Sequence, residues 1–511
     1  MIQPKEIGES NDRSSFIRFI IRNDGNRKLL CFAVVGGIVQ LLIFKSLYPF
    51  ADFFSDSYSY IYAAYADLDI SIWPIGYSKF LRLIHYVTTS DTVVVAFQYF
   101  FLEATCLYLY FTTLYFLKPG RSTRLILFGF LFFNPLFLYI SNYINSDPLF
   151  AALSIWWFAE LIWISYRPGV YQVFTHAILL FLCFSVRNNA YYYPIISILA
   201  FTLSKQKIFY KVIGLGLPVC LIVIFIVKTQ KAAEKLTGHK QFSLFTGWQL
   251  ANNALYMYKH IQVDSNRLPT NDCRELDRLS RKFFGQVTAD FDYFLGEWEA
   301  NFFIQYSRSP LKQYMYLNFR PKGEYETVVN WARASVVFEQ YGKWLIVRNP
   351  AAYAKYFMLL NSRHFFLPSL EKLEIYNRGE DKVEPIAKRW FNYRTVSVSS
   401  VSRGVQGHIL AVFPYLFFFL NVLTAGLVVW LGIRRKSAMI TAQGNYKVLL
   451  LIVSFLVANF CFCVSVTIVV MRYQFVPMIL TLGFGLLAME NLEKGIAGEK
   501  NPDMRGAEVI A

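Results

Sequence analysis

The stretch DFFSDSYSYIYAAYADLDISIWPIGYSKFLRL, residues 52–83, separates the first two apolar segments of the chain. It is too polar to span a bilayer and too aromatic to be a plain linker. Asp56 and Tyr60 are four residues apart, which places them on one face of a helix. Pro74 and Gly76 then favour a turn, because proline fixes φ and glycine accepts conformations closed to other residues. The stretch therefore predicts two short amphipathic helices that lie at a membrane surface.

The composition places the chain among membrane proteins. Of its 511 residues, 55% are hydrophobic and 18% are aromatic, which is too apolar for a soluble globular protein. The net charge of +17 would suit nucleic acid, but the Lys and Arg residues cluster in short loops between apolar segments. We therefore expect membrane lipids as partners and no nucleic acid.

About ten apolar segments approach the 20 or so residues that a membrane-spanning helix needs. They comprise residues 29–48, 93–117, 125–140, 149–165, 170–186, 190–203, 212–227, 409–433, 448–470 and 473–488. A single helix over residues 170–203 would reach about 50 Å, well beyond a hydrocarbon core of about 30 Å. We therefore predict a hairpin there, with Arg187-Asn188-Asn189 at its turn. The predicted fold is an all-α polytopic membrane protein.

The basic loops predict an orientation. If the N-terminus is cytoplasmic, every basic cluster in a short loop is cytoplasmic as well, as the positive-inside rule requires. These clusters lie at residues 118–124, 167, 205–211, 434–447 and 494–505. We expect a multi-pass protein of the plasma (inner) membrane with both termini cytoplasmic. The predicted parts are a cytoplasmic tail (1–28), a transmembrane module (29–227) with an outer loop (49–92), a mainly helical extracytoplasmic domain (228–408), C-terminal transmembrane helices (409–490) and a cytoplasmic tail (491–511).

Two arginines oppose the positive-inside bias. Arg187 and Arg472 lie at the outer ends of predicted spans, where an unpartnered arginine is costly. A guanidinium stays charged and binds pairs of phosphate oxygens, so one interpretation is that both residues hold a lipid-linked phosphate. The other interpretation is that they extend to the interface or pair with structural carboxylates.

Several acidic residues fall on the same predicted side. Asp56 is our candidate reactive group, because aromatic residues surround it and both misplaced arginines share its side. Asp52 is its rival, four residues earlier on the predicted helical face. Asp147 precedes Pro148 and is either the N-cap of the next span or a second acid of the pocket. The Asp-x-Asp pattern of residues 67–69 leaves a divalent metal open.

The order of these motifs resembles the GT-C superfamily of integral-membrane glycosyltransferases. The resemblance covers roughly residues 29–227 and the last two spans. The first-loop acidic motif is similar to Ser55-Asp56-Ser57-Tyr58-Ser59-Tyr60, and its Pro-x-Gly-Tyr turn to Trp73-Pro74-Ile75-Gly76-Tyr77. The second-loop motif is similar to Asn134-Pro135 with Ser146-Asp147-Pro148, and the basic positions to Ser185-Val186-Arg187 and Met471-Arg472-Tyr473.

The chain also departs from known branches of that superfamily. Ser57 follows Asp56, so the Asp-Glu pair of protein mannosyltransferases and aminoarabinose transferases is absent. Phe158 follows Trp156-Trp157, so the Trp-Trp-Asp signature of oligosaccharyltransferases is absent too. The large polar segment lies between the seventh and eighth predicted spans rather than at the C-terminus. The sugar and the acceptor therefore stay open.

The resemblance implies a reaction and roles for the candidate residues. The donor would be a sugar on a polyprenyl phosphate, and the acceptor a hydroxyl of a lipid or a surface glycan. Asp56 would be the general base of a single displacement with inversion. The donor phosphate would be held by Arg187 and Arg472. Tyr60, Trp73 and Tyr77 would stack on sugar rings or, alternatively, anchor the loop at the interface.

Two other functions compete with this one. A polymerase or ligase that uses a lipid-diphosphate glycan predicts further catalytic basic residues in the large outer domain, where Arg308, Lys312, Arg348 and Arg363 are available. A transporter or flippase needs no base and predicts a polar pathway with internal symmetry between halves. The spans contain few charges and no evident half-repeat, which favours an enzyme.

Overall fold

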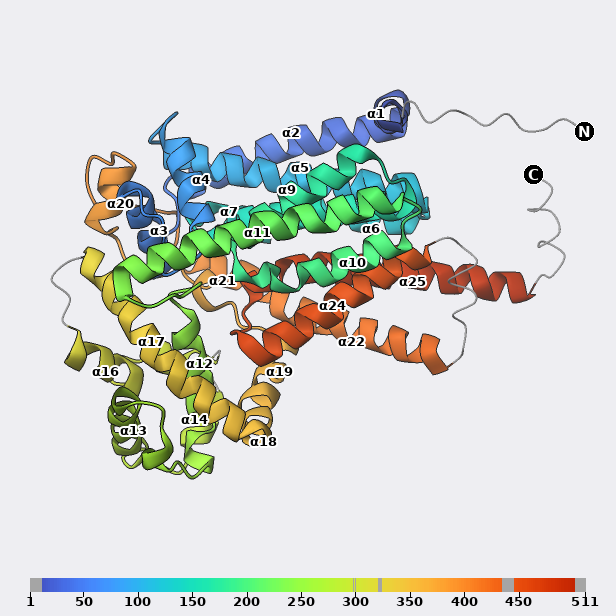
Figure 1. Cartoon of the computed structure of the whole chain (residues 1–511). Helices are drawn as coiled ribbons and strands as arrows, with labels where there is room; N and C mark the ends of the chain where they lie inside the picture. Colours follow the sequence, from blue (N-terminus) through green and yellow to red (C-terminus); the bar gives the residue numbers. More distant parts are fainter. Residues whose placement is uncertain (1–11, 297, 299, 320–323, 434–444, 501–511) are drawn as a thin grey trace, which may run out of the picture.

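The structure is a computed structural model that describes residues 12–296, 298, 300–319, 324–433 and 445–500. The parts of the predicted tails at residues 1–11 and 501–511, and the basic cluster at 434–436, lie outside these residues. Within them the fold is all-helical, and the only extended pairings are three isolated bridges. The predicted all-α class is therefore confirmed for the described chain (Figure 1).

Seven helices are long and apolar enough to cross a membrane. They are α2 (Asp24–Leu47), α5 (Asp91–Leu117), α6 with α7 (Arg121–Phe132 and Pro135–Asn142), α8 (Ser146–Tyr166), α11 (Ile208–Thr237), α21 with α22 (Val405–Leu410 and Val412–Ile433) and α24 (Tyr446–Val466). The other three predicted spans correspond to the shorter apolar helices α9 (Val170–Val186) and α10 (Tyr193–Leu203), and to the first part of α25 (Phe475–Lys500). Length and composition thus support seven spans in the described residues, where the sequence predicts about ten.

Two breaks in the bundle follow from local sequence. Asn134 caps α7 by accepting a hydrogen bond from the Leu136 amide at 3.0 Å, and Pro135 opens that helix, so the predicted span 125–140 divides here. The chain also turns between α9 and α10 through a short 3-10 helix (Asn188–Tyr192). His176 on α9 lies 2.8 Å from the Ser197 hydroxyl on α10, as the predicted hairpin requires.

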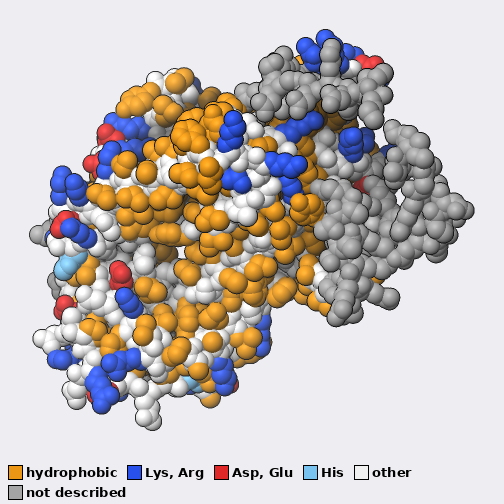
Figure 2. All heavy atoms as spheres, turned by 45° about the vertical axis from the view of Figure 1, so that its right-hand side comes forward, with side chains coloured by type: hydrophobic (Ala, Val, Ile, Leu, Met, Phe, Trp, Pro, Cys, Tyr) orange, Lys and Arg blue, Asp and Glu red, His pale blue; other side chains and the backbone are white. Residues whose placement is uncertain are grey.

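Both described ends of the chain reach the same end of the bundle (Figure 1). Ser15, in α1 (Asp12–Arg22), contacts the Tyr115 hydroxyl near the end of α5. Glu490 on α25 accepts a hydrogen bond from the amide of Gly120. Large apolar side chains on the outward faces of α2, α11 and α22 are exposed, as helices that face lipid would require (Figure 2).

The opposite end of the bundle carries the remaining helices (Figure 1). The two predicted helices of the first loop are present as α3 (Ser55–Tyr65) and α4 (Gly76–His85). Residues 246–358 form a second hydrophobic core around Trp248, Phe303 and Tyr341. Its helices are α12 (Thr246–Leu255), α13 (Asn271–Phe284), α14 (Phe291–Gly296), α15 (Phe302–Gln305), α16 (Pro310–Asn318), α17 (Glu324–Arg348) and α18 (Pro350–Tyr353). We call residues 246–358 the helical cap.

The rest of the long polar segment packs on the bundle instead. After α19 (Leu359–Phe366), residues 370–398 contribute Leu373, Tyr376 and Trp390 to the hydrophobic core of the transmembrane helices. This part includes α20 (Pro385–Trp390), which packs on α3. The sequence predicts one domain over residues 228–408. In the described part of the structure their buried apolar residues belong to the core of the cap, the core of the bundle and two small clusters that include Leu244 and Phe365.

Candidate active site

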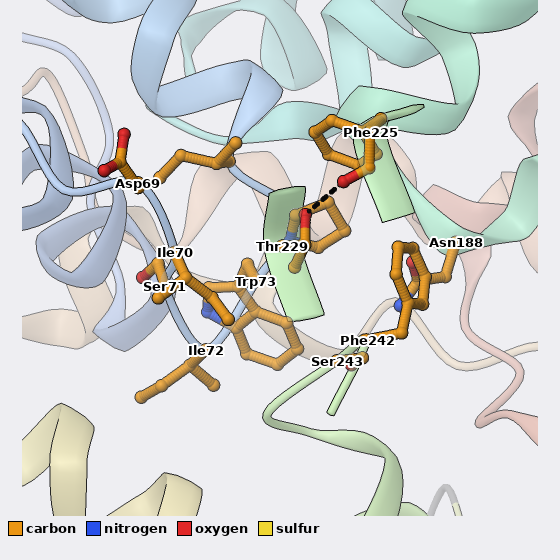
Figure 3. Close-up of a pocket in the computed structure, with 12 residues that line it drawn as sticks. Asp69, Ile70, Ser71, Ile72, Trp73, Asn188, Phe225, Thr229, Phe242 and Ser243 are labelled. Atoms are coloured by element: carbon orange, nitrogen blue, oxygen red, sulfur yellow. Dashed lines mark hydrogen bonds between the residues drawn. The ribbon is translucent and has the colours of Figure 1, made fainter. Parts of the chain in front are cut away.

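A cavity of about 740 Å³ lies where the helical cap meets the bundle. Five of the predicted site residues line it: Asp56, Tyr60, Trp73, Arg187 and Arg472. A separate small pocket of about 20 Å³ shares Trp73 and Asn188 with the cavity and is bounded by residues 69–75, by Phe225 and Thr229 of α11, and by residues 242–243 (Figure 3). The cavity is large enough for a sugar together with a phosphate group.

Six charged side chains form a continuous chain of ion pairs at the bundle side of this cavity. In spatial order they are Asp56, Lys372, Glu371, Arg472, Asp147 and Arg187. Lys372 Nζ lies 3.5 Å from Asp56 Oδ2 and 3.7 Å from Glu371 Oε1. Arg472 Nε lies 2.9 Å from Glu371 Oε2, and its Nη1 lies 3.1 Å from Asp147 Oδ2. We call these six residues the charged end.

Asp147 links the two arginines rather than capping a helix. The N-cap of α8 is Asn145, whose side chain accepts a hydrogen bond from the Ser146 amide. The N-cap interpretation of Asp147 is therefore wrong. Asp147 instead pairs with both Arg187 and Arg472, and its side chain is only 6% exposed. Two buried cations that share one carboxylate account for the arginines that oppose the positive-inside bias.

The arginines nevertheless face the cavity. Arg472 uses Nε and Nη1 on Glu371 and Asp147, so within the described residues its Nη2 group remains for a ligand. The Tyr473 ring lies against both guanidinium groups, with its centroid 4.2 Å from Arg187 and 4.5 Å from Arg472. At this end, the described cavity wall holds four cations against two carboxylates: Arg187, Lys372, Arg378 and Arg472 against Asp56 and Glu371. The wall is therefore suited to an anion.

Backbone contacts hold the distant segments of the charged end together. Residues 52 and 143 form an isolated parallel bridge, which joins the first loop to the loop before α8. A second bridge joins Ser369 to Val470, two residues before Arg472. Glu371 has a φ of 53°, in the left-handed region that costs a non-glycine residue of order 1 kcal/mol. Such strain persists only where the surroundings hold it, and it is typical of functional sites.

Neighbouring cations favour the charged form of Glu371. Burial alone would raise the pKa of its carboxyl group, but Arg472 and Lys372 outweigh burial and lower that pKa. Glu371 is therefore ionised and serves as the counter-charge that holds Arg472 at the cavity.

A close approach between the start of α4 and the end of α9 positions Arg187. A Cβ atom at Gly76 would lie 2.5 Å from the carbonyl oxygen of Ser185, at the end of α9. Only glycine permits this contact between the start of α4 and the segment that carries Arg187. The sequence attributes Gly76 to a turn, whereas the structure assigns it to helix packing.

Asp52 and Asp56 have different environments. Asp52 precedes α3 and so does not share its helical face, contrary to the prediction. Its side chain is buried and accepts hydrogen bonds from the Asn377 amide at 2.7 Å and from Gln406 at 3.5 Å. Burial raises the pKa of Asp52 to about 7. Asp52 therefore ties the first loop to residues 376–379, and Asp56 alone of the two faces the cavity.

The three candidate aromatic residues also have different surroundings. Tyr60 lines the cavity and its hydroxyl lies 2.9 Å from Ser146 Oγ, next to the charged end. Trp73 lines the cavity and packs on Phe245, the residue before α12, with 4.7 Å between ring centroids. Tyr77 is fully buried and donates a hydrogen bond to Gln98 at 2.7 Å. The structure thus places Tyr77 neither in the pocket nor at an interface.

The cap side of the cavity differs from the charged end. Its polar side chains are mostly amides, namely Gln249, Asn253, Asn301 and Gln305. Phe245, Trp331 and Lys312 complete this wall. We call these seven residues the amide end. Of the four basic residues that a polymerase or ligase would use, only Lys312 lines the main cavity, while Arg363 borders a separate cavity and Arg348 stacks on Trp344.

The two acids of the Asp-x-Asp pattern are separated: Asp69 borders the small pocket beside the cavity, and Asp67 pairs with residues of α4. Asp67 pairs with Lys79 at 2.8 Å and with Arg82 at 3.4 Å, both on α4. In the part of the chain that the structure describes, no group of three or more His, Cys, Asp or Glu side chains is arranged for a metal ion.

Comparison with protein-family models, with curated proteins and with solved structures finds no match for this chain. The site is therefore defined by its own geometry. Sequence reasoning misses Glu371 and Lys372, because they lie more than 300 positions after Asp56 and belong to no recognisable pattern. The only local signal is an acid beside a base, which is common on protein surfaces.

Proposed function

We propose that this protein is a membrane glycosyltransferase of the GT-C type. It moves a sugar from a polyprenyl-phosphate donor to an acceptor hydroxyl on the extracytoplasmic side of the membrane. One observation carries the proposal. Three candidate residues from separate segments of the sequence line one cavity and belong to one chain of ion pairs: Asp56, Arg187 and Arg472.

The charged end supplies what an inverting transfer requires. The acceptor oxygen attacks the anomeric carbon and forms the new C–O bond, while its proton passes to the Asp56 carboxylate. The bond between the anomeric carbon and the phosphate oxygen breaks, and the electron pair leaves with the polyprenyl phosphate. Arg472, Arg187 and Lys372 stabilise the negative charge that develops on that phosphate.

Lys372 also takes part in the proposed reaction. In the structure it pairs with Asp56, so an acceptor hydroxyl must displace it before Asp56 can accept a proton. The phosphate of a bound donor offers Lys372 a new partner within the same cavity. Donor binding thus frees the base, which favours donor binding before acceptor binding.

The test is sugar transfer by the full-length protein in membranes, with a panel of labelled polyprenyl-phosphate hexoses and pentoses and with total cell-surface glycan and lipid as acceptors. We expect labelled product and free polyprenyl phosphate from wild type. Asp56→Asn should bind donor but lose at least about 100-fold in rate. Transfer only from polyprenyl-diphosphate donors, or lipid movement across vesicles without transfer, would contradict the proposal.

A further inference from the structure

The amide end of the cavity takes no part in the chemistry at Asp56. It faces the charged end across the same space, and a transferase has to hold two substrates there. The cations of the charged end suit the donor phosphate. The amide end is therefore the part of the cavity available to the second substrate. The cation, the amides and the aromatic rings of this wall determine which ligand it can bind.

Lys312 is the one cation of the amide end. Its Nζ lies 4.2 Å from the ring centroid of Trp331 and 5.1 Å from that of Trp248, so aromatic faces replace part of its hydration. Within the described residues it belongs to no ion pair, unlike the cations of the charged end. Burial lowers the pKa of Lys312 to about 8. An ammonium group in this position gains from an anionic ligand.

The amides leave a hydrogen-bond acceptor without a partner. The Oδ1 atom of Asn301 is buried and accepts no hydrogen bond within the described residues. Gln249 and Asn253 hold each other at 2.7 Å, which fixes the orientation of this wall. The buried oxygen has almost no accessible surface and is shielded from the cavity, so the amides available to a ligand are those of Gln249, Asn253 and Gln305.

Aromatic rings line the cavity between its two ends. The Trp73 and Phe245 rings lie 4.7 Å apart, and Phe245 lies 6.4 Å from Trp331 with an angle of 18° between their planes. Trp331 also stacks on Trp248, with 4.0 Å between ring centroids, so these rings form one packed aromatic stack that offers an apolar surface to a sugar ring.

We propose that the amide end binds the acceptor, and that the acceptor is a carbohydrate bearing a carboxylate or phosphate group. Lys312 binds the anionic group, the aromatic stack of Trp331 and Phe245 packs on the sugar ring, and the amides of this wall bind its hydroxyl groups. This inference rests on the proposed function, because it assigns the second substrate of that reaction. It selects a glycan over a lipid as the acceptor.

The test is ligand binding to the full-length protein in detergent, followed by tryptophan fluorescence, to which Trp331 contributes. The probes are trigalacturonate, glucose 6-phosphate, and the neutral sugars trigalactose and glucose as matched controls. We expect at least one acidic probe to bind about 10-fold more tightly than its neutral control, since charge-assisted contacts are the stronger ones. Lys312→Met should abolish this preference, and Lys312→Arg should retain it.

Three results would overturn the inference: equal binding of acidic and neutral probes, no binding of either acidic probe at millimolar concentration, or an unchanged preference in Lys312→Met. Thermal unfolding of the same variants in detergent shows that the protein is folded, and Lys312→Met should leave the melting temperature nearly unchanged. A protein that binds the acidic probes through Lys312 but transfers no sugar would contradict the proposed function and leave this binding site in place.

Discussion

The two ends of the cavity hold their charges in different ways. At the charged end, three carboxylates and three cations form one chain of ion pairs, and Glu371, Arg472 and Asp147 have side chains less than 10% exposed. At the amide end, Lys312 rests on aromatic rings with no carboxylate paired to it among the described residues. The first arrangement fixes the geometry of the proposed reacting centre, and the second leaves a charge available to a ligand.

The two ends should also respond differently to mutation, in protein stability and in ligand binding. Removal of one member of a buried ion pair leaves its partner uncompensated, which typically costs about 3 to 5 kcal/mol. Removal of an unpaired lysine leaves no such partner. Variants at the two ends should therefore affect stability and ligand binding in different proportions.

The largest expected effect is on stability, in Arg472→Gln. This change leaves Glu371 and Asp147 short of their shared cation, so the free energy of unfolding should fall by about 3 kcal/mol or more. Thermal unfolding in detergent measures the effect. The control is Arg403→Gln, which removes a cation from an exposed pair with Asp381 and should cost about 1 kcal/mol or less. Similar losses in both variants would show that the charged end is not a buried network.

The next effect is on transfer, in Lys372→Met. Its side chain is 25% exposed and pairs with Asp56 and with Glu371, which are 16% and 7% exposed, so its loss should cost less stability than Arg472→Gln. The rate of sugar transfer should fall roughly 10- to 100-fold, because a cation near the leaving phosphate is lost. Lys388→Met, an exposed lysine on α20, serves as the control and should transfer at the wild-type rate. A Lys372→Met variant as active as wild type would remove Lys372 from the site.

The smallest effect is a pH dependence that involves Asp52. Its pKa is about 7 in the folded protein and 3.8 in a model peptide, so the unfolded state loses the proton first as pH rises. Its stabilising effect is complete below pH 3.8, falls as the pH rises and is lost just above pH 7. Asp52→Asn should therefore gain in apparent melting temperature relative to wild type between pH 5 and pH 8. A relative loss over that range would indicate a lowered pKa.

Much of the fold was predictable because the bilayer imposes length. A run of apolar residues long enough to span it is visible in the sequence, and α2, α5, α8 and α24 follow such runs closely. The turn at Arg187-Asn188-Asn189 was predictable for the same reason. The short helices α9 and α10 were harder, since their length alone does not establish that each one crosses a membrane.

The candidate site was only partly predictable. Asp56, Arg187 and Arg472 are detectable because charge is unusual at the ends of apolar segments. Their partners Glu371 and Lys372 are not detectable in the sequence, because only the folded chain brings this part of the long polar segment next to the first loop. Asp52 shows the limit of spacing arguments, because a four-residue interval implies a shared face only if the helix includes both residues.

Sugar transfer by Asp56→Asn and Asp52→Asn, measured side by side in the same membranes, tests the central claim most directly. The two aspartates are four residues apart, but one lines the cavity and the other is buried behind it. We expect Asp56→Asn to lose at least about 100-fold in transfer rate and Asp52→Asn to remain within about 3-fold of wild type. Equal rates for wild type and Asp56→Asn, or a larger loss in a correctly folded Asp52→Asn, would contradict the assignment of Asp56 as the base.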